Sequence, residues 1–219
     1  MTTKVKICGL KTDAALDAAL EGGADFVGFV FFDPSPRSLA PAVARDLAAR
    51  ARGRARTVAL LVDPDDALLH RVILTVEPDL FQLHGRESPE RIAAIARQFG
   101  RPIVKAISVT TADDAMVAKA YRDVTEFVLF DAKAPPASAI PGGNGVTFDW
   151  HLLDDVRGRV DYMLSGGLTA DNVAEAIRVA QPFAVDVSSG VETAPGVKSP
   201  DLIRRFLAAA KPAHASVQS

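Results

Sequence analysis

The chain has only one cysteine among its 219 residues, so no internal disulfide can form. That composition fits a reducing compartment, and we expect the protein in the cytoplasm. The first residues lack the apolar core of a signal peptide, and no apolar run approaches the roughly 18 residues that cross a bilayer. We therefore expect no membrane partner.

Neither sign of charge is in excess, since 25 Lys and Arg stand against 27 Asp and Glu, for a net charge of −2. We expect no nucleic-acid partner, because such surfaces carry a basic excess. The length and the 48% hydrophobic content predict one domain with one core, over residues 1–210. A tail over residues 211–219 has few apolar anchors and is expected to fray. A monomer is predicted over a homodimer.

Short β-rich apolar runs alternate with longer helical segments along the whole chain. The expected strands cover residues 4–7, 26–30, 57–62, 80–83, 102–107, 127–130, 162–165 and 183–187. One expected helix begins at Thr12, and the others cover residues 41–51, 65–76, 89–99, 112–121, 170–180 and 200–210. Ser88, Thr111 and Ser199 directly precede three of these helices, where a hydroxyl accepts from free amides of the first turn.

Eight alternating units fit either a closed barrel or an open doubly wound sheet. Strands 26–30 and 127–130 are apolar throughout, as strands covered on both faces should be. Spacings of roughly 20–35 residues between units favour the barrel. The dinucleotide fingerprint is missing after the first strand, where the sequence is Cys8-Gly9-Leu10-Lys11, and this weakens the open-sheet alternative. The sequence thus predicts a single α/β domain, a (β/α)₈ TIM barrel.

Two glycine-rich loops follow the expected seventh and eighth strands, where such barrels usually bind phosphate. Glycine lets backbone amides approach an anion closely, although it also serves in simple tight turns. The two loops in the expected places favour phosphate binding. The predicted phosphate-binding residues are Gly166, Gly167, Ser188, Ser189 and Gly190, with Gly143 and Gly145 from the loop after the sixth strand. That loop, residues 132–145, is either a lid or a disordered surface loop.

Cys8 and Asp131 end the first and sixth strands, at the barrel face where active sites lie. As a thiolate, Cys8 would be a competent proton acceptor, and inert packing is an equally open interpretation. Apolar neighbours can raise the pKa of Asp131, so that it stays protonated and can donate a proton. The alternative is an Asp131 that pairs with Lys133 or caps the following loop.

Three further polar residues lie at strand ends or in the loops after them. Arg37 stands in a proline-bounded loop, and its guanidinium suits bidentate recognition of a carboxylate, with a solvated surface arginine as the default alternative. Asp186 could orient the thiol, orient a substrate hydroxyl or accept backbone hydrogen bonds. His84 ends the fourth strand, but no other histidine has a spacing or strand-end position that would build a metal site with it. We therefore expect no metal and no cofactor.

Several ordered segments together carry a family resemblance. They are Lys6-Ile7-Cys8-Gly9, Gly28-Phe29-Val30-Phe31, Ser35-Pro36-Arg37, Gln82-Leu83-His84-Gly85, Phe130-Asp131, Gly142-Gly143-Asn144-Gly145, Phe148-Asp149-Trp150, Ser165-Gly166-Gly167-Leu168 and Val185-Asp186-Val187-Ser188-Ser189-Gly190-Val191-Glu192. In these segments the chain resembles the phosphoribosylanthranilate isomerase family of tryptophan biosynthesis. One departure is Asn144, where a serine is expected, and it puts only a hydroxyl contact in doubt.

The resemblance implies an Amadori rearrangement of a small phosphorylated substrate, without a cofactor. Asp131 would protonate the ring oxygen of the ribose, and Cys8 would then remove the proton from C2′. Arg37 would hold the anthranilate carboxylate, and the glycine-rich loops would hold the phosphate. Asp186 corresponds to a further active-site carboxylate near the sugar.

Two other functions remain as alternatives. The histidine-pathway isomerase performs the same chemistry with an acidic residue at the end of the first strand, where this chain has Cys8. A non-catalytic barrel that binds a phosphorylated metabolite would keep the glycine loops but would not need the pair of Cys8 and Asp131. The presence of both residues favours the enzyme.

Overall fold

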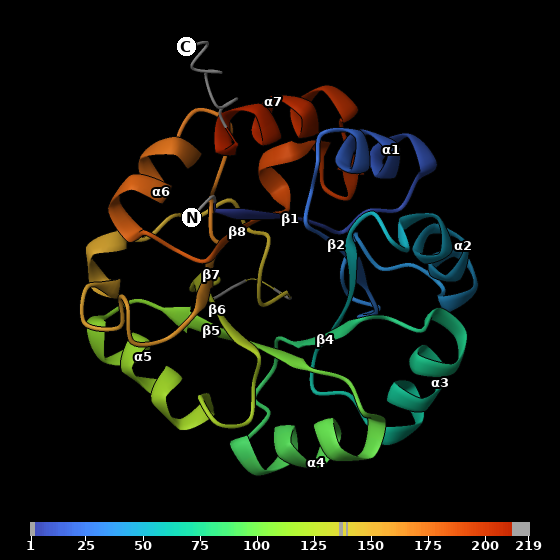
Figure 1. Ribbon diagram of the computed structural model, residues 1–219, viewed down its shortest axis with the longest axis horizontal. Coiled ribbons are helices and arrows are strands. Elements are labelled where there is room, and N and C mark those ends of the chain that lie inside the picture. The colour runs from blue at the N-terminus through green and yellow to red at the C-terminus, as the bar shows by residue number, and fades with distance from the viewer. Residues whose placement is uncertain (1–2, 136–137, 139, 212–219) are drawn as a thin grey trace, which may run out of the picture.

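The computed structural model describes residues 3–135, 138 and 140–211. Eight parallel strands close into a barrel in the order β1 to β8, and the helices form a ring around it (Figure 1). The strands are β1 (Lys4–Cys8), β2 (Phe26–Val30), β3 (Arg56–Leu61), β4 (Leu80–Leu83), β5 (Ile103–Val109), β6 (Phe127–Ala132), β7 (Tyr162–Leu164) and β8 (Ala184–Val187). The helices are α1 (Asp13–Glu21), α2 (Pro41–Ala51), α3 (Asp66–Val76), α4 (Pro89–Phe99), α5 (Ala112–Met116), α6 (Val173–Ala180) and α7 (Pro200–Ala210). The predicted TIM barrel is confirmed.

Side-chain caps fix where several helices begin. Ser88, Thr111 and Ser199 each accept a hydrogen bond from the amide three residues later, as their positions in the sequence predict. Proline occupies the first turn of α2, α4 and α7, where its missing N–H costs no helical hydrogen bond. The boundaries of these three helices agree with the predicted ranges.

Three segments differ from the prediction. The helix expected over 112–121 is divided into α5 and the 3₁₀ helix η1 (Val117–Tyr121). Among the described residues between β6 and β7, the only helix is the short 3₁₀ helix η2 (Trp150–Leu153). The helix expected over 170–180 begins at Val173. Here the Asn172 side chain accepts from the Thr169 amide and donates to the Gly167 carbonyl, which holds the chain in a turn.

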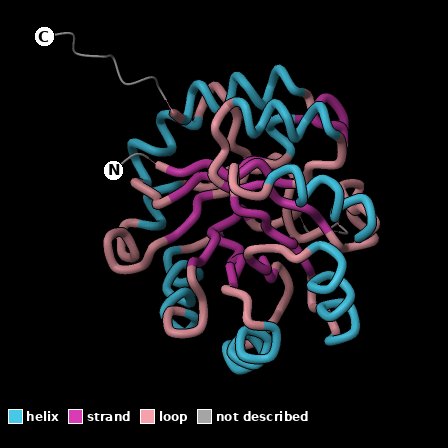
Figure 2. The backbone as a smooth tube through the Cα atoms, turned by 45° about the vertical axis from the view of Figure 1, so that its right-hand side comes forward, coloured by secondary structure: helices cyan, strands magenta, loops and turns pink. Residues whose placement is uncertain are grey.

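Figure 2 shows the strands enclosed by the helices. The apolar core lies in two places, between the strands and the helices and inside the barrel near the N-terminal ends of the strands. Inside the barrel, Phe26, Val58, Leu80 and Leu129 are all buried. Because side chains alternate along a strand, the next inward positions lie toward the C-terminal ends, and there they become polar. The buried polar residues at these positions are Lys6, Gln82, His84, Asp131 and Asp186.

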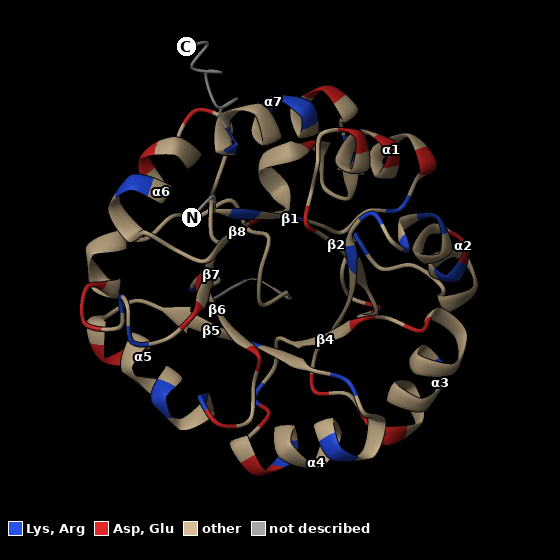
Figure 3. Cartoon of the chain, in the orientation of Figure 1, with Lys and Arg blue, Asp and Glu red and all other residues tan. Residues whose placement is uncertain are grey.

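The first and last strand–helix units of the chain lie side by side, since α1 packs beside α7 and β1 pairs with β8 (Figure 1). Residues of both charge signs are distributed around the helix ring (Figure 3). Within residues 3–135, 138 and 140–211, no helix is long and apolar enough to cross a membrane. The predicted frayed tail lies, from residue 212 on, outside the described residues.

A buried ion pair ties together the loops that follow β3 and β4. Lys105 Nζ on β5 lies 2.8 Å from Glu87 Oε2, and both side chains are less than 5% exposed. Lys105 also donates to the Gly85 carbonyl at 2.7 Å, and Glu87 Oε1 accepts from the Asp63 amide at 2.9 Å. Each charge therefore has the hydrogen bonds that a buried group needs.

We expect Glu87→Ala to lower the free energy of unfolding by about 3–5 kcal/mol, because it leaves the Lys105 ammonium buried without a counter-charge. Urea denaturation of the purified protein measures the change. Glu175→Ala is the matched control, since Glu175 pairs with Arg178 on the exposed face of α6, where a pair contributes at most about 1 kcal/mol. Similar losses in the two variants would contradict a stabilising role for the buried pair.

Candidate active site

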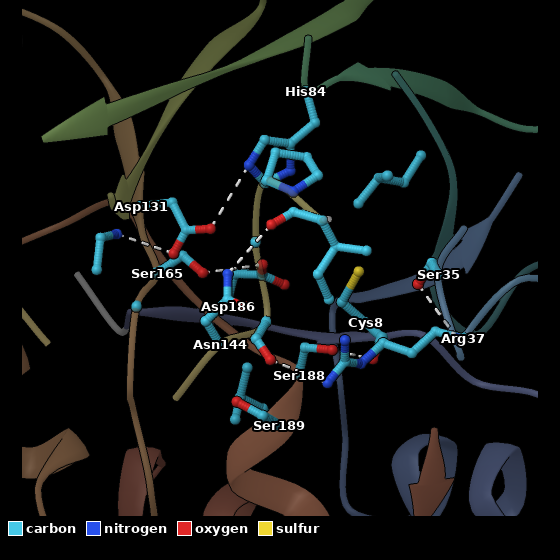
Figure 4. Close-up of a pocket in the computed structure, with 18 of the residues that line it drawn as sticks. Cys8, Ser35, Arg37, His84, Asp131, Asn144, Ser165, Asp186, Ser188 and Ser189 are labelled. Atoms are coloured by element: carbon cyan, nitrogen blue, oxygen red, sulfur yellow. Dashed lines mark hydrogen bonds and ion pairs between the residues drawn. The ribbon is translucent and has the colours of Figure 1, made fainter. Parts of the chain in front are cut away.

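A cavity of about 730 Å³, including its open mouth, lies at the C-terminal end of the barrel strands. Figure 4 shows polar side chains from several strands turned into it. The structure brings every predicted site residue to this one cavity. These residues are Cys8, Arg37, His84, Asp131, Gly143, Gly145, Gly166, Gly167, Asp186, Ser188, Ser189 and Gly190.

Cys8 is the last residue of β1 and is 3% exposed. Its strand partner is Gly28, whose missing side chain leaves room for the thiol, since a Cβ at that position would lie 3.0 Å from Cys8 Sγ. Burial raises the pKa of the Cys8 thiol, while the nearby positive charges of Lys6 and Lys198 oppose that rise. The thiol is therefore placed in the cavity beside two ammonium groups.

Asp131 lies on β6 and is 3% exposed. Burial, together with the negative charge of Asp186, raises the pKa of Asp131 to about 7. Its Oδ1 accepts from the Ala132 amide at 2.9 Å, and its Oδ2 lies 3.5 Å from His84 Nε2. Lys133 is not a partner of Asp131 among the residues described. The carboxyl group can therefore hold a proton at neutral pH and release it to a bound molecule.

His84 is neutral, because burial and the charges of Lys105 and Lys6 lower its pKa to about 3. Its contact with Asp131 is therefore not an ion pair. Within the described part of the chain, His84 Nε2 and Gln82 Oε1 are buried without a hydrogen-bond partner, and both residues line the cavity. Unpaired buried polar atoms of this kind are suited to bind hydroxyl groups of a ligand or ordered water.

Asp186 on β8 is held by two neighbours. Its Oδ1 lies 2.8 Å from Lys6 Nζ, and its Oδ2 accepts from Ser165 Oγ at 3.3 Å. Of the three roles left open by the sequence, accepting backbone hydrogen bonds is not the one seen among the described residues. The carboxylate is instead half of a buried ion pair.

Arg37 is 5% exposed, and its guanidinium fork is already engaged. Nε and Nη2 donate to the two carboxylate oxygens of Glu192, each at 2.8 Å, and Nη2 also donates to the Gly143 carbonyl at 3.1 Å. Glu192 is in turn 2.7 Å from Lys198 Nζ. Nη1 is the guanidinium nitrogen that remains for a ligand, and a Cβ on Gly143 would lie 2.6 Å from it.

The glycine-rich loops after β7 and β8 touch each other through their backbones. A Cβ on Gly190 would lie 1.9 Å from the Leu168 carbonyl oxygen, so no larger residue fits there. Gly166 and Gly167 have φ of 93° and 59°, and within the described residues their amides donate to no protein acceptor. Free amides in a left-handed backbone conformation can face an anion in the way that a phosphate site requires.

The segment 140–146 lies across one side of the cavity. A Cβ on Gly142 would lie 2.6 Å from Asp131 Oδ2 and 2.7 Å from His84 Cε1, so glycine allows this segment to rest directly on the carboxyl group. Asn144 faces its own loop, where Oδ1 accepts from Ser138 Oγ at 2.8 Å. Residues 136–137 and 139 of the same loop lie outside the described residues.

The sequence prediction missed Lys6, Gln82, Glu192 and Lys198. Lys6 and Gln82 each lie two residues before a predicted site residue on the same strand, so strand alternation was a signal that would have placed them inside the barrel. Glu192 and Lys198 belong to a hairpin of β9 (Glu192–Ala194) and β10 (Val197–Lys198) that the sequence did not predict. Among the described residues, no three His, Cys, Asp or Glu side chains are grouped as a metal site would need.

Comparison with known proteins gives one consistent family. The family model described as N-(5'-phosphoribosyl)anthranilate (PRA) isomerase matches residues 5–209. The enzyme of that name from Rhodopseudomonas palustris strain BisA53 is 54% identical over 211 residues, which are 96% of this chain and 97% of that protein. The crystal structure of phosphoribosyl anthranilate isomerase from Thermotoga maritima is 37% identical, with a TM-score of 0.85 over 95% of this chain and 98% of that one. A structure of the same kind of enzyme, in complex with reduced 1-(o-carboxyphenylamino)-1-deoxyribulose 5-phosphate, has 35% identity and a TM-score of 0.83 over the same shares.

Proposed function

Because this chain belongs to the N-(5'-phosphoribosyl)anthranilate isomerase family, we propose that Asp131 and Cys8 are the general acid and base of its reaction. The protein is an isomerase of tryptophan biosynthesis, and it converts N-(5'-phosphoribosyl)anthranilate to 1-(2-carboxyphenylamino)-1-deoxyribulose 5-phosphate. The observation that carries the proposed roles is that a thiol and a carboxyl group with a pKa of about 7 line one buried cavity.

The first step opens the ribose ring. Asp131 gives its proton to the ring oxygen while the bond from that oxygen to C1′ breaks. The nitrogen lone pair forms the C1′=N bond of a protonated Schiff base, so charge is conserved. A carboxyl group that holds its proton near pH 7 suits this step, because a general acid works best with a pKa near the operating pH.

The second step moves a proton from carbon. The Cys8 thiolate removes the proton from C2′, the C1′=C2′ bond forms, and the electrons of the C=N bond return to nitrogen. The resulting enolamine tautomerises to the aminoketone. A thiolate placed in a cavity beside Lys6 and Lys198 is suited to act as the base, since both charges favour its ionised form.

The remote groups of the substrate would be held on the side of the cavity away from β4. The amides of Gly166, Gly167, Ser189 and Gly190 would bind the phosphate, with help from Ser188, Gly143 and Gly145, and all these residues line the cavity. Arg37 Nη1 is placed to bind the anthranilate carboxylate, while Glu192 fixes the guanidinium. His84, with its neighbour Gln82, would face the sugar. Binding energy from these groups orients the reacting atoms.

We expect Arg37→Met to weaken binding of the reduced product analogue by about 10- to 100-fold, since a hydrogen bond to a charged group contributes about 1.5–3 kcal/mol. Calorimetry with the analogue and with a matched compound that lacks the carboxylate measures the effect. The second compound should lose little affinity in the variant, because the contact under test is absent. An equal loss for both compounds would show that Arg37 acts by supporting the loop instead.

The direct test of the function generates phosphoribosylanthranilate in situ and follows the loss of its fluorescence with the purified protein. Rapid loss is the expected result. An inactive protein would overturn the substrate assignment, and the histidine-pathway substrate would be tested next. No cofactor is added in this assay, in line with the prediction that none is needed. The predicted monomer stays a prediction.

A further inference from the structure

Lys6 is a fully buried ammonium group to which the proposed steps give no contact with the substrate. It lies on β1 inside the barrel with 0% exposure, and its partner among the described residues is Asp186, directly opposite on β8. An ammonium group has three N–H donors, and only one of them is engaged by that carboxylate. Well-packed apolar residues in place of a buried ion pair are often neutral or stabilising, so stability alone does not account for the pair.

The Lys6 side chain shares its space with the Cys8 thiol. The two residues are two positions apart on β1, so both point into the barrel. A Cβ on Gly28 would lie 3.0 Å from Cys8 Sγ and 3.3 Å from Lys6 Cε, so the thiol and the lysine stem both lie close to Gly28. The Lys6 charge is the strongest of the influences that lower the pKa of the thiol against its burial.

The other half of the pair is directed toward the general acid. Figure 4 shows Asp186 between Cys8 and Asp131, with Ser165 bonded to its second oxygen. After burial, the charge of Asp186 is the largest cause of the raised pKa of Asp131. Each charge acts on both residues: Lys6 lowers and Asp186 raises the pKa of Cys8, with Lys6 the stronger, and Asp186 raises and Lys6 lowers the pKa of Asp131, with Asp186 the stronger.

We propose that the Lys6–Asp186 ion pair is a positioning element of the reaction: its ammonium favours the Cys8 thiolate, and its carboxylate favours the neutral form of Asp131. The inference rests on the proposed roles of those two residues. The proposed effect of the pair is on the protonation of its two neighbours.

The benefit of such a pair follows from how the two groups share protons. The reaction needs Cys8 ionised and Asp131 protonated. Burial raises the pKa of the thiol above its ordinary range, and therefore above the value of about 7 for Asp131. When the two residues share one proton, that proton therefore lies mostly on Cys8. The form with a Cys8 thiolate and a protonated Asp131 is the minor one. Its share falls tenfold for each unit that separates the two pKa values. The ion pair moves the two values toward each other.

Other groups also face the two reactive residues. Lys198, from the hairpin after β8, adds a second positive charge near Cys8. Asp131 faces neutral His84, accepts from the Ala132 amide and lies near enough to Lys6 to feel a small opposing effect. Lys198, His84 and the Ala132 amide are unaltered by a change to Lys6 and Asp186, so they serve as a constant background in the test.

The test is the double variant Lys6→Met/Asp186→Asn, which removes both charges at nearly constant volume and leaves no buried ion unpaired. Cys8 is the only cysteine, so the pH dependence of its alkylation by iodoacetamide reports this thiol alone. We expect its midpoint to rise by about one unit or more. The midpoint of kcat/KM that belongs to Asp131 should fall, and kcat/KM should drop by about tenfold or more at neutral pH.

The single variants separate charge from packing. Lys6→Met should raise the midpoint of thiol alkylation, and Asp186→Asn should lower it. A loss of packing would instead move this midpoint in the same direction in both variants. Ser165→Ala, which removes an uncharged partner of Asp186, should leave the thiol midpoint in place. Lys6→Arg keeps the charge and should restore the wild-type midpoint.

A folded double variant with both midpoints within about 0.3 unit of the wild type would overturn the proposal, since neighbouring charges normally shift a pKa by more than that. Another result would leave the effect of the ion pair on the two pKa values intact and would overturn the proposed role of Cys8 as the base. If the midpoints move as expected while Cys8→Ser stays fully active, then the ion pair acts on the thiol but the thiol is not the base.

Discussion

Asp131→Asn is expected to lower kcat by about 10²–10⁴-fold, because an amide cannot give the ring oxygen the proton that a carboxylic acid gives. Stopped-flow or steady-state fluorescence with phosphoribosylanthranilate measures the loss. The variant should bind the reduced product analogue nearly as well as the wild type, since the residues proposed to bind the phosphate and the carboxylate lie elsewhere in the cavity. A variant with near-normal turnover would show that another group protonates the ring.

The pH dependence of the same variant identifies the group. Below pH of about 7 both Asp131 and Cys8 hold protons in the free wild-type enzyme, so the thiolate is missing and kcat/KM should rise with pH through that midpoint. At higher pH, kcat/KM should fall again when both the thiol and Asp131 have lost their protons, because no general acid then remains. The lower midpoint should be absent from Asp131→Asn, whose activity should follow the thiol alone.

Asp131→Asn should also stabilise the fold at alkaline pH. The pKa of Asp131 is raised from 3.8 to about 7, so the folded state holds this proton to higher pH than the unfolded state. Stability from this group is therefore full below about pH 4 and is lost as pH rises to about 7, at about 1.36 kcal/mol for each unit of pKa shift. Urea denaturation at pH 8 should favour the variant, and the advantage should vanish at pH 4. An advantage that is equal at both pH values would contradict a buried charge as its cause.

Cys8→Ser is expected to lower kcat by a similar factor of about 10²–10⁴, because a hydroxyl group is not ionised at neutral pH and is a poor base in its neutral form. The substitution changes little in volume, so circular dichroism and affinity for the product analogue should stay close to the wild type. Cys8→Ala is the control for size, and it should lose at least as much activity. If Cys8→Ser keeps its activity, Asp186 becomes the leading candidate for the base.

Much of the fold could be predicted from the sequence because the patterns that mark its helices and strands are local. The ranges of α2, α4 and α7 agree with the prediction, since a proline in the first turn and an apolar stripe mark each of them. The predicted start of α6 was wrong. The Asn172 side chain forms hydrogen bonds with the backbone of Thr169 and Gly167, and these bonds hold the chain in a turn where a helix was expected. Helix propensities of single residues do not include this competition between side-chain hydrogen bonds to the backbone and helical hydrogen bonds.

The site was readable to the extent that strand ends determine it. All the residues chosen at strand ends and in the loops after them line one cavity, because parallel strands bring those ends together. The partners of these residues were not readable. Arg37 binds Glu192 across 155 positions, and Lys6 binds Asp186 across 180, so neither pair leaves a local pattern in the sequence.

The Lys6–Asp186 pair has a consequence for how the protein comes into being. Lys6 and Cys8 leave the ribosome first, yet the carboxylate that neutralises Lys6 is synthesised 180 residues later. Until β8 is added beside β1, the first strand carries a charge that cannot be buried favourably. The strand pair that closes the barrel, β1 with β8, is therefore also the pair that gives Lys6 its counter-charge. A truncated nascent chain would have the Cys8 thiol without Asp186, so the arrangement of base, acid and ion pair comes only with the finished fold.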